Sequence, residues 1–238
     1  MQSTTNKKRT FFGHPYPLSS LFFTEMWERF SFYGIRPLLI LFMAGTVYEG
    51  GMDIPREQAS AIVGIFAGAI YLTSLPGGWL ADNWLGQRMA VWYGSIIIAL
   101  GHLSIALSAI WSPKLFFVGL LFIVIGTGLF KTCVTVMVGT LYKQDDTRRD
   151  GGFSLFYMGI NMGSFIAPLA TGWLVPNFGW HWGFGIGGLG MLVALLVFRF
   201  YAVPLMRQYD GEVGLDSSWD RPTVARKNVG KWVGLAAV

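Results

Sequence analysis

The sequence predicts an all-α membrane protein in which six transmembrane helices form one bundle. Of the 238 residues, 53% are hydrophobic and only 13% are charged, roughly half the charged share of an ordinary soluble domain. The apolar residues are grouped in blocks of about 20 or more, enough for a helix to cross a hydrocarbon core of roughly 30 Å. Buried strands of soluble proteins are shorter and less uniform, so these blocks decide the fold class.

Six apolar segments have the length of a membrane-spanning helix, and turn-forming or charged residues separate them. One break combines Gly50, Gly51 and Pro55, and another contains Ser112 and Pro113. The predicted transmembrane helices cover residues 18–44, 57–82, 88–110, 115–142, 152–176 and 181–202. An even number of spans places both ends of the bundle on the same side of the membrane.

The distribution of basic residues predicts which side that is. Loops on one side hold only Arg56 and Lys114, whereas the other side carries Lys7, Lys8, Arg9, Arg88, Lys143, Arg148, Arg149, Arg199 and Arg207. Because basic residues near helix ends are retained in the cytoplasm, we expect both ends to be cytoplasmic, in the inner (plasma) membrane. The chain then divides into a cytoplasmic tail (1–17), a six-helix bundle (18–202) and a cytoplasmic linker (203–238). The apolar stretch 231–238 is expected to begin a further span.

Composition also excludes several other functions. The net charge of +5 is spread between the apolar blocks rather than gathered into an aromatic-rich basic patch, which argues against nucleic acid. The single cysteine, Cys133, lies inside an apolar block, so the chain has no intrachain disulfide and no paired-cysteine metal or redox motif. The first apolar block is too long for a signal peptide, and we expect it to be retained.

A weak internal repeat and pairs of small residues bear on how the helices pack. Residues 78–83 and 172–177 share Gly-Trp-Leu and end the second and fifth spans, as expected if spans one to three recur, inverted, as spans four to six. Small residues four apart permit close helix contact. Such pairs are Gly64 with Gly68 and Gly159 with Gly163.

Ionisable residues inside the predicted spans are the strongest indication of function. The first span contains Glu25, Glu28, Arg29 and Arg36, and the fourth contains Lys131 near its midpoint. Inserting each costs roughly 2.5–3.5 kcal/mol, so none is expected to face lipid. These side chains are expected to contact protein or a water-filled cavity instead.

The spacing of the first-span charges places them on one helix face together with Phe32, over about 16 Å. One interpretation is a structural salt bridge from Arg29 to Glu25 or Glu28. Pairing alone does not account for all five charges, because three cations face two carboxylates. A substrate carboxylate, or an acid from helices outside this chain, is expected to supply the missing negative charge.

Other polar residues in the spans are weaker candidates. His102 could be a proton relay, although a hydrogen-bonded core histidine is the commoner case. Tyr71 and Asn161 each offer a hydrogen-bonding group near mid-membrane, for a cavity or for interhelical contact. Asp82 and Arg88, at the cytoplasmic ends of the second and third spans, are expected to form an ion pair that stabilises a gate.

Three motifs then identify a family. EMWERFSFYG at 25–34 resembles the ExxERFxYYG motif of the proton-dependent oligopeptide transporters (POT, also called PTR), a branch of the major facilitator superfamily. FYMGINMG at 156–163 is similar to the second signature of that family. GGWLADNWLGQR at 77–88 is similar to the superfamily's loop between helices two and three. The motifs occur in family order, and the resemblance extends over residues 14–202.

The resemblance implies a proton-coupled symporter that imports di- and tripeptides by alternating access between two six-helix bundles. This chain would be the N-terminal bundle, with two inverted three-helix repeats, and would need a C-terminal bundle as partner. Protons would be the coupling ion, with no other cofactor and no metal. The residues would act as follows: Glu25, Glu28, Arg29 and Lys131 in proton coupling; Arg36 and Lys131 on the peptide carboxylate; Tyr33, Tyr71 and Asn161 in the pocket. In the implied cycle, Glu25 alternates between a salt bridge with Lys131 and a protonated state.

Two departures and three alternatives remain. Phe32 stands where the motif usually has tyrosine, which removes a hydroxyl, and the second span lacks the histidine of animal members. A transporter for another anion, such as nitrate, would use Arg36 and Lys131 equally well. A membrane sensor or scaffold would explain the spans but not the charges within them. An enzyme is the least favoured class, since the sequence shows no nucleophile–base pair and no phosphate loop.

Overall fold

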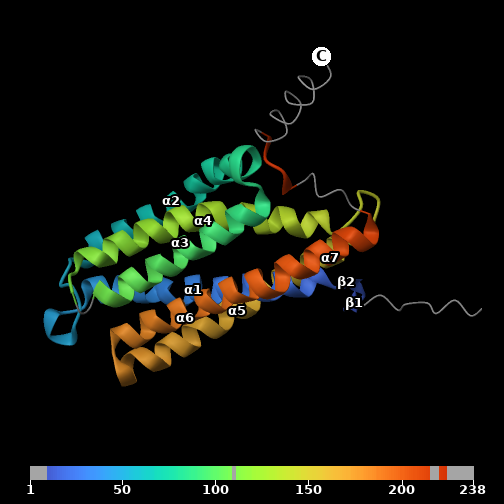
Figure 1. Ribbon diagram of the computed structural model, residues 1–238. Helices are drawn as coiled ribbons and strands as arrows, with labels where there is room; N and C mark the ends of the chain where they lie inside the picture. The colour runs from blue at the N-terminus through green and yellow to red at the C-terminus, as the bar shows by residue number, and fades with distance from the viewer. Residues whose placement is uncertain (1–9, 109–110, 215–219, 224–238) are drawn as a thin grey trace, which may run out of the picture.

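The computed structural model describes residues 10–108, 111–214 and 220–223 and confirms the predicted bundle (Figure 1). Each predicted span corresponds to one long helix, with ends that differ by a few residues. The helices are α1 (Pro17–Ala44), α2 (Arg56–Leu80), α3 (Gln87–Ser108), α4 (Lys114–Thr140), α5 (Arg149–Phe178) and α6 (Trp180–Val197). The main difference is α5, which already begins within the charged stretch expected to be a loop.

Among the described residues, five helical segments are long and apolar enough to cross a membrane: Arg56–Leu85, Gln87–Ser108, Lys114–Thr140, Arg149–Phe178 and Trp180–Val213. The first helix, α1, has 28 residues and reaches about 42 Å, which is also long enough. Its composition sets it apart, because any 18-residue stretch of α1 contains Glu28, Arg29 and at least one of Glu25 and Arg36. The helix of greatest functional interest is therefore the least apolar.

Short elements join the helices. Before α1 lies a hairpin of β1 (Thr10–Phe11) and β2 (His14–Pro15), and after it a 3-10 turn, η1 (Val47–Glu49). Two π-helical turns, η2 (Ala81–Leu85) and η3 (Phe198–Ala202), extend α2 and α6. The chain continues beyond residue 203 as α7 (Val203–Val213), where the sequence suggested only a linker. The apolar stretch 231–238 lies outside the described residues.

The six helices pack as two groups of three that lie against each other. The helix α1 packs on α5 and α6, while α4 packs on α2 and α3, and the two groups are visible as separate layers in Figure 1. Exchanging α1 with α4, α2 with α5 and α3 with α6 converts one group into the other. That exchange is the pairing expected from two inverted three-helix repeats.

Glycines set how closely the helices approach. A Cβ at Gly101 of α3 would lie 2.8 Å from the carbonyl oxygen of Gly119 in α4, so the two backbones are in contact. A Cβ at Gly163 of α5 would overlap the carbonyl of Met26 in α1. The predicted close packing at Gly159 and Gly163 is confirmed. Gly64 and Gly68 face open space in this chain, so packing within the bundle does not explain them.

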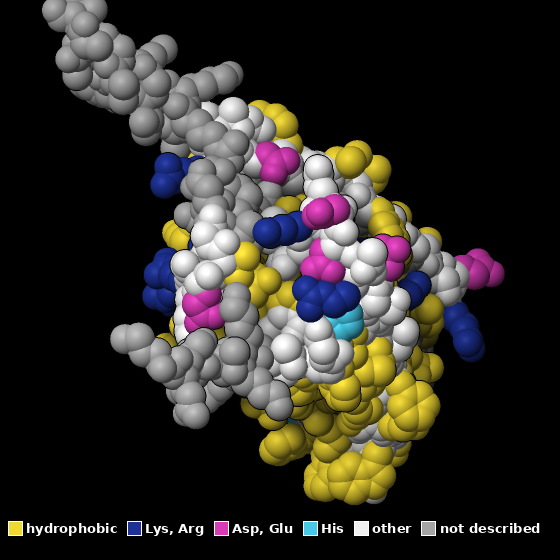
Figure 2. Space-filling model, turned by 90° about the vertical axis from the view of Figure 1, so that its right-hand side faces the viewer, with side chains coloured by type: hydrophobic (Ala, Val, Ile, Leu, Met, Phe, Trp, Pro, Cys, Tyr) yellow, Lys and Arg dark blue, Asp and Glu magenta, His cyan; other side chains and the backbone are white. Residues whose placement is uncertain are grey.

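Charged side chains gather at the end of the bundle where α1 begins and α6 ends. Figure 2 looks onto this end and shows basic and acidic side chains together, with hydrophobic side chains along the flank. The starts of α3 and α5 and the end of α4 lie at the same end, as the predicted up-and-down order of the spans requires. The asymmetry of basic residues seen in the sequence is therefore an asymmetry between the two ends of the fold.

The contact between α3 and α4 can be tested by Gly101→Ala. The added methyl meets a backbone carbonyl that no side-chain rotation can move, so overpacking should lower the free energy of unfolding by about 1–3 kcal/mol. Gly185→Ala in α6 is the matched control, because a Cβ there meets nothing within 4 Å and gains the same helix propensity. Thermal unfolding in detergent measures both variants, and equal melting temperatures would contradict the close contact.

Candidate functional site

The first-span charges form a buried cluster on α1. Glu25, Glu28 and Arg29 are only 3%, 1% and 6% exposed. The Nε atom of Arg29 donates a hydrogen bond to Oε1 of Glu25 at 2.7 Å and lies 2.9 Å from Oε2 of Glu28. One guanidinium thus binds two carboxylates, and the salt bridge predicted from the sequence is confirmed for both acids.

The cluster is incompletely satisfied. Two carboxylates and one guanidinium sum to one negative charge when both acids are ionised. The Oε2 atoms of Glu25 and Glu28 and Nη2 of Arg29 have no hydrogen-bond partner among the described residues. The guanidinium also lies 5.9 Å from the ring centre of Phe32, which stacks on Phe66 at 6.3 Å. Buried charge without full compensation is costly, so the cluster is held at an energetic cost in this arrangement.

The remaining candidates are more accessible. Arg36 and Asn161 are exposed, Tyr71 is 67% exposed, and Tyr33 and Lys131 are half-buried. The ammonium of Lys131 lies 4.4 Å from the ring centre of Tyr71, a cation–π contact between α4 and α2. No described carboxylate lies within ion-pair distance of Arg36 or Lys131. These two cations are free to receive an anion.

The charged residues on one face of α1 do not share one environment in the structure. Of the two environments expected for these charges, Glu25, Glu28 and Arg29 are in contact with protein, since α5 and α6 cover the helix. Only Arg36 of that face is exposed. The predicted contact of Glu25 with Lys131 is not formed in this conformation, although Lys131 is close enough to act electrostatically on Glu28.

His102 is part of the helix packing. Its Nε2 shares a short hydrogen bond of 2.5 Å with Oγ of Ser31, and both side chains are 1% exposed. Gly187 of α6 leaves the room for this contact between α3 and α1. The reading of His102 as a hydrogen-bonded core histidine is confirmed. Ser31 was not singled out from the sequence, where a small residue in a helix carries no signal of its own.

The predicted ion pair between Asp82 and Arg88 is wrong. Nη2 of Arg88 donates to Asp210 at 2.5 Å, and Nη1 lies 3.5 Å from Asp220, while Asp82 accepts a hydrogen bond from Gln87 at 2.6 Å. The π-helical turn at the end of α2 leaves Asp82 exposed, whereas Arg88 is buried. Asp210 and Asp220 lie in the stretch regarded as a linker, where no sequence pattern pointed to them as partners of Arg88.

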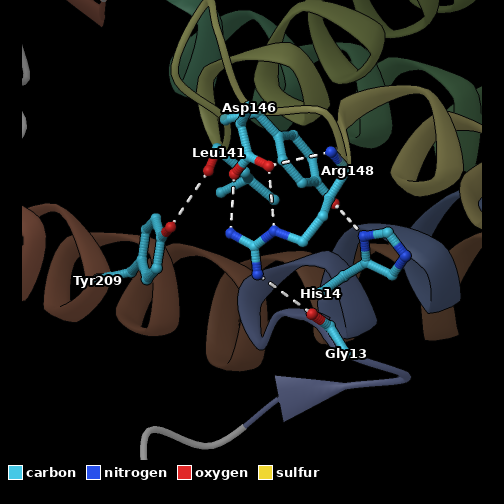
Figure 3. A network of polar contacts seen from close by, with 7 residues as sticks. Gly13, His14, Leu141, Asp146, Arg148 and Tyr209 are labelled. Atoms are coloured by element: carbon cyan, nitrogen blue, oxygen red, sulfur yellow. Dashed lines mark hydrogen bonds and ion pairs between the residues drawn. The ribbon is translucent and has the colours of Figure 1, made fainter.

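A second network ties the hairpin to the same end of the bundle (Figure 3). The Arg148 side chain donates to both oxygens of Asp146 and, at 3.2 Å, to the carbonyl of Gly13. His14 shares a hydrogen bond of 3.0 Å with the hydroxyl of Tyr142. Hydrogen bonds from Arg148 hold the pKa of Asp146 at about 2. Because that pKa is lowered, the carboxylate stays ionised at physiological pH, and its attraction to Arg148 is lost only in strong acid.

These features define a multi-pass membrane protein with an internal acid–arginine cluster and, among the described residues, no group of three or more acids, histidines or cysteines that could hold a metal. The chain belongs to the POT family, whose family model matches residues 88–206. It is 76% identical, over 98% of its length, to peptide transporter YePEPT of Yersinia enterocolitica subsp. palearctica serotype O:3 (strain YE-P4), of which it covers 46%. It is 41% identical, over 96% of its length, to a di-/tripeptide transporter of Lactococcus lactis subsp. lactis (strain IL1403), of which it covers 45%.

Solved structures give the same result for the fold. A peptide transporter POT in complex with sulfate matches with a TM-score of 0.80 at 39% identity, over 97% of this chain and 46% of that chain. A POT family transporter in complex with a thioalcohol conjugated peptide matches with a TM-score of 0.82 at 34% identity, over 97% and 46%. The chain thus spans about half the length of the relatives it matches.

The Arg88 cluster can be tested by Arg88→Ala. The change leaves the buried carboxylate of Asp210 without its guanidinium, which should lower the free energy of unfolding by about 3 kcal/mol and loosen α7 from α3. Arg207→Ala, which removes an exposed guanidinium from the same helix as Asp210, is the control and should change stability little. Hydrogen exchange of α7 is the measurement. Equal protection in the two variants would mean that the cluster does not hold α7.

Proposed function

We propose that this chain is the N-terminal bundle of a proton-coupled symporter that imports di- and tripeptides by alternating access. A C-terminal six-helix bundle would complete the central site, and both ends of this chain would face the cytoplasm in the inner membrane. Relatives named as peptide transporters and as a di-/tripeptide transporter support the substrate class. The basic residues gathered at one end of the fold support the orientation.

The observation that carries the proposal is the separation of two charged groups. Glu25, Glu28 and Arg29 are buried with excess negative charge, while Arg36 and Lys131 are accessible cations without a carboxylate partner among the described residues. A proton suits the first group and a peptide carboxylate suits the second. Neither a sensor nor a scaffold needs this pairing of a buried acid cluster with open cations.

The proton step takes place at the acid pair. When both carboxylates are ionised, Arg29 neutralises only one, and the remaining charge lies in a region that water reaches poorly. A proton on Oε2 of Glu25, the oxygen that does not contact Arg29, would remove that charge while Nε of Arg29 keeps its contact with Glu28. We propose that the acid pair is the coupling group, with Glu25 as the carboxyl that changes state.

The peptide step takes place at Lys131 and Arg36. A terminal carboxylate binds to these cations through charge-assisted hydrogen bonds, which are about twice as strong as neutral ones. Tyr71 positions Lys131 by its ring contact, and Tyr33 and Asn161 add polar groups from α1 and α5. The residue that binds the peptide amino terminus is expected in the C-terminal bundle.

Lys131 links the two steps. Its charge acts on Glu28, so ionised acids hold the ammonium toward α1, and protonation releases it toward the substrate. Proton and peptide are then bound together or not at all. Only the doubly loaded and the empty forms would let the two bundles move, which gives symport driven by the proton gradient.

The defining experiment uses the full-length protein in proteoliposomes and measures uptake of a labelled dipeptide with and without an inward proton gradient. Gradient-dependent uptake that unlabelled dipeptides inhibit and nitrate does not would support the proposal. Inhibition by nitrate alone would indicate a transporter for another anion. Absence of both binding and uptake would leave a sensor or scaffold.

Replacing Lys131 with Ala should abolish gradient-driven uptake and leave the bundle folded. Loss of a charge-assisted contact to the carboxylate should weaken peptide binding about tenfold or more, and the half-buried side chain contributes little to packing. Lys114→Ala is the matched control, since it removes an exposed lysine from the same helix. Near-normal driven uptake by the Lys131 variant would refute its role, provided that both variants melt at the same temperature.

Glu25→Gln should separate exchange from accumulation. The amide mimics a protonated carboxyl and can still accept the hydrogen bond from Nε of Arg29, so counterflow of peptide should continue. Accumulation against a gradient should fall at least about fivefold, as expected when a proton–substrate coupling free energy is lost. Glu49→Gln, an exposed acid at the far end of the bundle, is the control. An equal fall in both activities would assign Glu25 to structure.

A further inference from the structure

An apolar cleft of about 520 Å³ runs between α3 and α6 on the flank of the bundle. Residues one helical turn apart form both walls, from Ile96 to Ala106 in α3 and from Gly185 to Leu195 in α6. Leu100, Leu103 and Leu192 are about half exposed along its edges. The only titratable side chain in the lining, His102, is held by Ser31.

The cleft is separate from the proposed transport site. The candidate residues for proton and peptide lie on α1, α2, α4 and α5, and none of them lines the cleft. The two walls are parts of membrane-spanning helices, so their apolar edges lie within the hydrocarbon region. A molecule that enters this cleft comes from the bilayer.

A cation and an indole lie at one end of the cleft. One turn beyond Leu195, Arg199 continues the α6 wall, and one turn before Ile96, Trp92 continues the α3 wall. The guanidinium carbon of Arg199 lies 5.6 Å from the ring centre of Trp92. Arg199 is exposed and has no carboxylate within ion-pair distance among the described residues.

We propose that this cleft is a binding site for an anionic phospholipid of the leaflet on the side where α1 begins and α6 ends. One acyl chain occupies the cleft between α3 and α6, and the phosphate is bound by the Arg199 guanidinium, which suits the bidentate recognition of phosphate oxygens. Trp92 holds the guanidinium at the level of the headgroups, where indole rings are favoured.

The dimensions fit a lipid. From Gly185 to Arg199 the α6 wall extends about 21 Å, which exceeds the roughly 15 Å depth of one leaflet and leaves the cation at the headgroup level. Gly185 and Gly188 have no side chains, which leaves room for an acyl chain to lie against α6. A Cβ at Gly185 would meet nothing within 4 Å. A negative headgroup is favoured because Arg199, the cation at the mouth, has no carboxylate partner in the part of the chain that the structure describes.

The test is native mass spectrometry of the full-length protein released from nanodiscs that contain equal amounts of phosphatidylglycerol and phosphatidylethanolamine. The unaltered protein should retain phosphatidylglycerol preferentially. Arg199→Gln should lower that retention about fivefold, the effect of one basic residue near an anionic surface. Arg207→Gln is the matched control, because it removes an exposed arginine from α7, beyond the cleft.

A second pair of variants tests the acyl chain. A Cβ at Gly185 meets nothing within 4 Å, so Gly185→Leu should fill the cleft and displace the retained lipid, while Gly185→Ala should leave it bound. Equal retention of the two lipids by the unaltered protein would overturn the proposal. So would equal losses in the Arg199 and Arg207 variants, which would indicate diffuse attraction, or retention unchanged by Gly185→Leu. Because the readout is lipid retention, it stands independently of peptide transport.

Discussion

Two carboxylates and one guanidinium are held inside a membrane-spanning helix, and the rest of the bundle is arranged around that constraint. Arg29 binds Glu25 and Glu28 directly. Charges at this depth are tolerated only where protein excludes lipid, so α5 and α6 must lie tightly against α1. Gly163 allows this, because a Cβ there would overlap the backbone of Met26. The glycines of the second signature and the charges of the first motif thus form one physical unit.

The charged residues fall into a buried group on α1 and an accessible pair, Arg36 and Lys131, and this difference limits which ligand each group can bind. A proton is small enough to reach carboxylates that are at most 3% exposed, whereas a larger anion needs cations that are accessible. Arg36 and Lys131 satisfy that second requirement. In the function proposed above, the charge of Lys131 acts on Glu28 without contact, so a change at one group affects the other.

Helix positions could be predicted from the sequence because each apolar block is bounded by turn residues or charges, and the pairing of Arg29 followed from its spacing to Glu25 and Glu28. The features that could not be predicted from the sequence depend on tertiary packing. Burial of that cluster required α5 and α6, which no local pattern on α1 reveals. Arg88 binds Asp210 and Asp220, far along the chain, and a π-helical turn carries Asp82 away from it. Gly64 and Gly68 resemble a packing pair but face open space in this chain, because their four-residue spacing is the same whether or not another helix lies against them.

The exchange symmetry of the bundle explains why α3 and α6 differ from the other four helices. Each repeat places one helix in the packing centre, α1 or α4, and a second, α2 or α5, beside it, and these four carry every candidate residue for proton and peptide. The third helices, α3 and α6, pack against each other on the flank and carry only the gating candidate Arg88 and His102, which the structure shows as a hydrogen-bonded core histidine. They are instead free to meet the bilayer, and their shared cleft with Arg199 at its mouth follows from that position. A hydrogen bond between His102 and Ser31 joins α3 of this outer pair to α1, the helix that carries the charge cluster.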